Sequence, residues 1–190
     1  MIQSEELLQK LSLESTIKEE EIPEIDLYMD QVIQLFDSKF AKTLRNDEEK
    51  VLTKTMINNY AKGKLFIPIK NKKYSKQHIM LISMIYQLKG TLSINDIKAT
   101  LDPINKRLES ENFELEQFYS TLVHLQKKNA ENISKQIRIL EKEIELEEAQ
   151  EELKQISFIA SLASMSNAFR KAAEIMVDGL LENNKEDKKK

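Results

Sequence analysis

Clustered lysine and asparagine side chains are the polar groups in this sequence that indicate a binding function. The stretch from Val51 to Asn95 holds eight lysines and neither Asp nor Glu. The 50 residues before it carry a net charge of −7 and the residues after it a net charge of −4, in a chain of −3 overall. A basic stretch in an acidic protein is typical of polyanion binding, and nucleic acid is the simplest such partner.

A short helix predicted over Lys54–Lys62 carries the first group of polar side chains. Thr53 is expected to cap its start and Gly63 to lie at the C′ position after its end. Its inward face would hold Ile57, Tyr60 and Ala61. The outward face would then consist of two lysines, a threonine and two asparagines: Lys54, Thr55, Asn58, Asn59 and Lys62.

Two adjacent asparagines in a short helix lower its stability, because asparagine is a poor helix former. Recognition is one reason to keep them, since an asparagine amide can bond the N6/N7 edge of adenine, worth roughly 1–3 kcal/mol of discrimination. We therefore expect base contacts from Thr55, Asn58 and Asn59. The alternative is an ordinary polar face on which one asparagine bonds a neighbouring loop.

A β-hairpin or wing is predicted directly after this helix. The apolar run Leu65–Ile69 leads to a Lys/Asn tip, and Tyr74 begins the return. Lysines at such a tip would lie along a phosphate backbone. The expected phosphate contacts are Lys54, Lys62, Lys64, Lys70, Lys72, Lys73 and Lys76.

Helices are also predicted on both sides of the basic stretch. One runs from an Asp26 N-cap to about Leu44, with apolar residues three and four apart. Ser75 would cap a strongly apolar helix over about 76–89. Ser93 would begin a shorter helix that Asp102-Pro103 stops.

The order of these pieces resembles the MerR-type winged helix-turn-helix. A Thr/Ser-capped helix, a Gly-x-Leu-x-x-Pro turn and a basic wing ending in Tyr are followed by a Leu-Ser-Ile-x-x-Ile element. The matching residues are Thr53, Tyr60, Leu65, Pro68, Tyr74, Ile79, Leu92 and Ile97.

The stretch LTKTMINNYAKGKLFIPIKNKKYS is similar more closely still to the YkrK-like bacterial proteins of unknown function, which are treated as transcriptional repressors. This resemblance covers residues 20–103 and implies DNA binding. At the positions of Asn58 and Asn59, MerR-type proteins usually have Arg and Tyr that face DNA. The loop from Arg45 to Leu52 is also longer than their tight turn. Base preference and docking should therefore differ from the MerR pattern.

Residues 104–190 contain no proline and a single glycine, Gly179. Apolar residues three and four apart, first over 115–144 and then over 156–180, predict two long helices. We expect a helical hairpin or coiled-coil pair. A two-fold dimer would bury such long stripes, as MerR-type proteins do with a long C-terminal helix. The alternative is an intramolecular bundle in a monomer.

Composition narrows the class of protein. Only three Gly and three Pro in 190 residues predict a mainly helical chain with one core, or a small domain and an appendage. There is no cysteine, which excludes disulfides and thiolate sites. The N-terminus has no signal-peptide pattern, and the uncharged segment 155–169 is too short and polar to span a bilayer. A cytoplasmic protein without membrane association is expected.

Catalytic and metal-binding patterns are missing from the sequence. His78 and His124 lie far apart, whereas zinc needs about four ligands. His78 is expected to contact DNA or cap a helix, and His124 to lie on a helix surface. The acidic run over 141–152 is typical of a solvated helix face. The sequence therefore predicts no enzyme, cofactor or metal, and it indicates no inducing ligand.

These observations predict a mainly α protein in four parts. They are an acidic N-terminal arm (1–22) with Leu7, Leu8 and Leu11 on one stripe, a MerR-like winged helix-turn-helix (23–103), a helical dimerisation region (104–182) and a disordered tail (183–190). The expected function is sequence-specific binding of double-stranded DNA by a homodimeric repressor. The alternatives are a coiled-coil adaptor whose basic stretch meets an acidic protein, and a peripheral membrane protein. The last is disfavoured because no basic amphipathic helix with aromatic residues is present.

Overall fold

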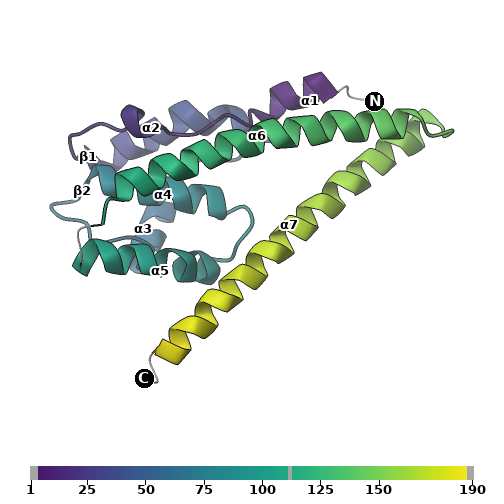
Figure 1. Cartoon of the computed structure of the whole chain (residues 1–190). Coiled ribbons are helices and arrows are strands. Elements are labelled where there is room, and N and C mark those ends of the chain that lie inside the picture. Colours follow the sequence, from purple (N-terminus) through teal and green to yellow (C-terminus); the bar gives the residue numbers. More distant parts are fainter. Residues whose placement is uncertain (1–3, 111–112, 188–190) are drawn as a thin grey trace.

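The computed structural model describes residues 4–110 and 113–187, and this part of the chain is mainly helical, as predicted (Figure 1). Two short 3-10 turns, Glu19–Glu21 and Ala41–Thr43, flank the first long helix of the core. In chain order the α-helices are α1 (Ser4–Leu11), α2 (Met29–Phe40), α3 (Lys54–Lys62), α4 (Lys76–Leu88), α5 (Ile94–Ser110), α6 (Leu115–Glu145) and α7 (Glu151–Asp187).

A two-stranded antiparallel sheet ties the chain before α2 to the chain before α4. Strand β1 (Leu27–Tyr28) pairs with β2 (Lys73–Tyr74), with Leu27 opposite Tyr74 and Tyr28 opposite Lys73. Leu27 and Tyr74 are buried, whereas Tyr28 is exposed. The sheet therefore has one face on the core and one face in solvent.

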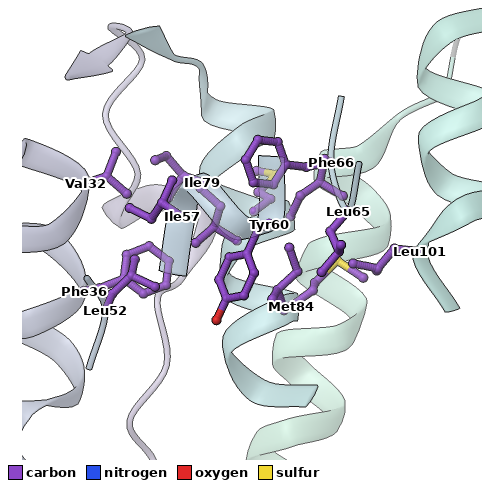
Figure 2. Close-up of a cluster of buried hydrophobic side chains, with 14 of the residues drawn as sticks. Val32, Phe36, Leu52, Ile57, Tyr60, Leu65, Phe66, Ile79, Met84 and Leu101 are labelled. Atoms are coloured by element: carbon purple, nitrogen blue, oxygen red, sulfur yellow. The ribbon is translucent and has the colours of Figure 1, made fainter. Parts of the chain in front are cut away.

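Helix α4 forms the centre of the core. Every residue from His78 to Ile85 is buried, so the helix is covered on all sides. Figure 2 shows side chains of α2, α3 and α5 converging on Ile79 and Met84 of α4. A helix that is apolar all round is stable only when its neighbours surround it, which fixes the positions of the other helices.

The predicted N-terminal arm (1–22) packs against this core through its last residues. Ile17 and Ile22 are buried among the side chains around α4. The hydroxyl of Tyr119, on α6, donates to the carbonyl of Ile17 at 2.6 Å and lies 3.0 Å from the Ser83 hydroxyl of α4. Burial raises the pKa of this phenol to about 12. Segments about 100 residues apart therefore share one buried contact.

Helix α1 lies along the far half of α6 (Figure 1). The Ser4 N–H donates to Glu141 Oε1 at 2.6 Å, and Arg138 Nε lies 2.8 Å from Glu5 Oε1. Leu7 and Leu8 pack against a small buried cluster on α6 and α7, while Leu11 stays exposed. The expected apolar stripe thus docks through two of its three leucines.

Two predicted helix ends were wrong. Helix α2 begins at Met29 rather than after Asp26, because Leu27 and Tyr28 are extended in β1 and Tyr28 takes the N-cap position. Helix α5 continues through Pro103 to Ser110. A proline removes one backbone hydrogen bond, and the buried Leu101 before it and the half-buried Leu108 after it keep the helix against the core.

Helices α6 and α7 form a V rather than a paired hairpin (Figure 1). Near the connecting turn, Phe158 of α7 is buried against Ile137 and Ile144 of α6. Near its other end, α7 reaches the main core through Val177. Between these points Phe169 is 72% exposed. Within the described residues no helix combines the length and apolarity that a membrane span requires.

The predicted tail begins inside α7, which continues to Asp187. Residues 188–190, the end of that tail, lie outside the described residues. The backbone over 183–187 is therefore helical.

Replacement of Tyr119 by phenylalanine is expected to destabilise the fold by about 1–3 kcal/mol, because the Ile17 carbonyl loses a buried partner. The measurement is urea unfolding of the two proteins. Tyr28→Phe is the matched control, since Tyr28 is 56% exposed and should change the unfolding free energy little. Equal decreases in unfolding free energy for both variants would show that the Tyr119 hydroxyl does not hold α6 to the segment around Ile17.

Candidate nucleic-acid interface

Helix α3 has the predicted boundaries and presents the predicted face. The Thr53 hydroxyl accepts the Met56 N–H at 3.1 Å and so caps the first turn. Ile57 and Tyr60 are buried against α2 and α4, as Figure 2 shows. The opposite side is exposed at all five expected positions, and we call it the reading face: Lys54, Thr55, Asn58, Asn59 and Lys62.

The end of α3 is fixed by a tight turn. The Leu65 N–H donates to the Tyr60 carbonyl and the Lys64 N–H to the Ala61 carbonyl, both at 3.0 Å, which is the Schellman arrangement. Lys64, with a φ of 55°, is the left-handed residue and occupies the C′ position. Gly63 is therefore the C-cap and not the C′ residue that was predicted. A Cβ on Gly63 would come within 2.7 Å of Leu65 Cδ1, which explains the glycine. The turn leaves the Lys64 side chain exposed.

A two-residue turn carries the tip lysines. The Lys73 N–H donates to the Lys70 carbonyl at 3.0 Å, and Asn71 and Lys72 have φ of 53° and 58°. Two consecutive positive φ values identify a type I′ hairpin turn, which we call the wing turn (Lys70–Lys73). Lys70, Asn71 and Lys72 are exposed and Lys73 is half-buried. The expected strand over 65–69 does not form, because Leu65 and Phe66 are buried in the core and β2 pairs with β1 instead.

The reading face and the wing turn meet at the start of α2. The amine of Lys54, in the first turn of α3, lies 2.7 Å from Asp30 Oδ1. The amine of Lys73 lies 5.3 Å from the centre of the Tyr28 ring. Since Tyr28 and Asp30 are two residues apart, lysines from the two basic segments lie on the same side of the molecule.

Two of the predicted phosphate contacts are already paired with carboxylates: Lys54 with Asp30, and Lys76, which is the more buried of the two. The amine of Lys76 lies 2.6 Å from Glu24 Oε1 and 3.4 Å from Glu19 Oε1, and its side chain is only 18% exposed. The Glu24 carboxylate, with Glu19 beside it, raises the pKa of Lys76. This lysine connects α4 to the N-terminal segment and would reach a phosphate only after releasing both carboxylates.

Lys89, which also belongs to the basic stretch, points inward. Its amine donates to the Val51 carbonyl at 2.8 Å and lies 4.3 Å from the centre of the Tyr86 ring, and burial lowers its pKa. The six other predicted phosphate contacts are Lys54, Lys62, Lys64, Lys70, Lys72 and Lys73, and only Lys73 among them is half-buried.

His78 caps helix α4, as one of the two sequence-based expectations stated. Its Nδ1 accepts the Ser75 N–H at 3.1 Å, so the proton lies on Nε2, which donates to the Ile67 carbonyl at 3.2 Å. The ring is only 5% exposed, and burial lowers its pKa. A histidine in this position holds the loop between the reading face and α4 and does not face a ligand.

Tyr28 is a candidate contact residue that the sequence did not reveal. It was expected within an amphipathic helix, but it is exposed beside the wing turn. Its position could not be predicted from local sequence, because it depends on pairing between strands 45 residues apart. His124 lies on the surface of α6, as expected. Among the described residues no three His, Cys, Asp or Glu side chains gather into a metal site.

Comparison with known proteins gave one match. The family model described as a domain of unknown function (DUF1836) matches residues 17–122. Neither the curated proteins nor the solved structures contain a match to the chain. The matched range begins at the buried Ile17 and extends past Tyr119 in α6, so it includes both residues that the Tyr119 hydrogen bond joins.

Stability is expected to fall as the pH drops below about 6.5, the ordinary pKa of histidine. The pKa of His78 is lowered in the folded state, so the unfolded chain takes up a proton at a higher pH than the folded protein does. One proton sets an upper limit of about 1.4 kcal/mol per pH unit on this slope. Urea unfolding between pH 7 and pH 5 measures it. His78→Asn should remove most of this slope, and an unchanged slope in the variant would assign it to other groups.

Proposed function

This chain belongs to the DUF1836 family, a domain of unknown function, and we propose that it is a transcriptional regulator that binds double-stranded DNA sequence-specifically. The observation that carries this proposal is the acid-free reading face of α3, with both asparagines exposed, next to the wing turn. A helix of this width enters the major groove, and a basic hairpin beside it would follow the sugar–phosphate backbone.

The proposed contacts divide by chemistry. The amides of Asn58 and Asn59 and the hydroxyl of Thr55 bond base edges, with adenine the preferred partner of an asparagine. Phosphate contacts come from lysines at both ends of α3, in the turn after it and in the wing turn. We assign them to Lys54, Lys62, Lys64, Lys70, Lys72 and Lys73, where Lys54 must first release Asp30. Lys76 contributes only after both of its ion pairs break.

A MerR-like winged helix-turn-helix is the proposed domain type, with α2 and α3 as the helix pair and Lys70–Lys73 as the wing. The residues that carry the resemblance are mostly structural here: Tyr60, Leu65, Tyr74, Ile79, Leu92 and Ile97 are all buried. Thr53 is the N-cap of α3. The likeness to MerR-type and YkrK-like proteins therefore supports a similar backbone fold. Asn58 and Asn59, which differ from the MerR pattern, are the proposed base-contacting residues of this chain.

The proposed active species is a homodimeric repressor in the cytoplasm. Two copies of α3 related by a two-fold axis would read half-sites about 34–36 Å apart, one helical turn of DNA. The long helices α6 and α7 supply the surface for the dimer.

A coiled-coil adaptor is the second candidate, and one observation favours it. Lys76 already binds the carboxylates of Glu19 and Glu24, which shows that this basic region accepts acidic groups. An acidic protein surface would use the same lysines. It would not need the amides of Asn58 and Asn59, and this difference separates the two candidates.

Salt should weaken the complex steeply. If a dimer neutralises about eight phosphates, log K falls against log salt with a slope of about −7. Lys72→Ala is expected to weaken all duplexes alike and to reduce that slope by about 2 in a dimer. Lys127→Ala, an exposed lysine on α6, is the matched control and should leave the slope unchanged. If Lys72→Ala leaves the salt slope unchanged, the wing turn is not part of the DNA interface.

Asn58→Ala should act differently from Lys72→Ala. It is expected to relax preference at one base pair per half-site, with a loss of about 5–150-fold in discrimination and little change in non-specific binding. Competition with duplexes that vary at single positions measures this. Equal shifts in specific and non-specific binding would show that Asn58 does not read a base.

A further inference from the structure

Helix α7 exposes an uncharged face that a folded monomer leaves in water. From Gln155 to Phe169 the helix carries no charged residue. Phe158 and Leu162 face α6, but Ile156 and Leu153 point the other way and are 55% and 52% exposed. Because Leu153, Ile156, Ala160, Ala163 and Asn167 follow at spacings of three and four, they form one continuous stripe, which we call the outer face.

The outer face contains both a protrusion and a hollow. Leu153 and Ile156 are its large side chains, at the end near the α6–α7 turn. The hollow comes next along the helix and is lined by Ala160, Ala163, Ser164, Asn167, Ala168 and Lys171. Large residues beside a hollow of small ones, on one helix, are the features that a self-complementary contact needs.

We propose that the outer face of α7 pairs antiparallel with the same face of a second copy of this chain. A two-fold axis between Ala160 and Ala163 places Ile156 of each copy over the hollow of the other, near Asn167. The alanines at the crossing let the two backbones approach closely, as small residues do wherever helices pack tightly.

The charges at the two ends of the uncharged segment fit this orientation. On the outer face Glu152 precedes it and Lys171 follows it. Lys154, which lies between Glu152 and the segment, is half-buried on another side of the helix, where its amine donates to the Glu145 carbonyl at 3.0 Å. In the antiparallel register Glu152 of one copy lies beside Lys171 of the other, and this pair occurs twice in the dimer. A parallel pairing would place like charges together at both ends, which opposes association.

This inference rests on the homodimer of the proposed function and adds its surface and orientation. It does not depend on DNA binding. The inner side of α7 is held against α6 through Phe158 at one end and against the main core through Val177 at the other, so only the stretch between them, around the exposed Phe169, is open on that side.

The test is the mass of the full chain in solution, followed across concentration by sedimentation. The unaltered protein should be a dimer. Ile156→Glu and Ala163→Glu are each expected to raise the dimer dissociation constant at least about 100-fold, because every dimer then buries two unpaired carboxylates. Phe169→Glu introduces the same charge on an exposed position of the other face and should leave the constant unchanged. Circular dichroism checks that each variant remains helical.

Charge exchange tests the orientation. Glu152→Lys and Lys171→Glu should each weaken the dimer about three- to tenfold, and the double variant should restore it. Cysteine variants add a readout that does not depend on the glutamate variants folding. Since the chain has no cysteine, oxidation of a mixture of Ala160→Cys and Ala163→Cys should yield a covalent dimer, whereas Phe169→Cys should not.

Three results would overturn the interface. If Ile156→Glu and Ala163→Glu leave the dimer dissociation constant unchanged, the outer face is not the interface, although the proposed homodimer is retained. A double charge variant weaker than both single variants refutes the antiparallel register. A protein that is monomeric at every concentration refutes both the interface and the homodimer, while a gel shift still tests the DNA-binding proposal by itself.

Discussion

The structure depends on the complete burial of helix α4. Because His78–Ile85 is apolar enough to need cover on every side, the surrounding helices and the segment around Ile17 must all pack against it. This requirement turns Ile57 and Tyr60 of α3 inward, and helical periodicity then leaves Asn58 and Asn59 in solvent. The exposed face of α3 is therefore a consequence of the core, and it is held by the most buried part of the protein.

Backbone caps make that face rigid at both ends. Thr53 fixes the first turn of α3, the Schellman turn at Lys64 fixes the last, and His78 fastens the following loop through Ile67. The wing turn adds two residues with positive φ, which set its direction. Preorganised side chains lose little conformational entropy on binding, so a surface held in this way suits recognition of a duplex of fixed shape.

Local signals made part of this arrangement predictable from the sequence. The bounds of α3 follow from Thr53 and Gly63, and the exposure of Asn58 follows from a period of 3.6 residues. Features that depend on distant pairing were not predictable: β1 with β2, and Lys76 with Glu19. Pro103 was misread because the burial that holds α5 in place outweighs the cost of a proline inside a helix, about 3 kcal/mol. The divergence of α7 from α6 also depends on tertiary contacts, since its residue spacing alone predicted a paired hairpin.

We propose that the reading face of α3 and the wing turn together bind a specific duplex. A gel shift of the full chain with DNA flanking its own gene tests it most directly. A discrete band is expected at nanomolar protein, which unlabelled specific DNA removes and random DNA does not. Equal competition by both DNAs, or no band at low salt, would contradict it.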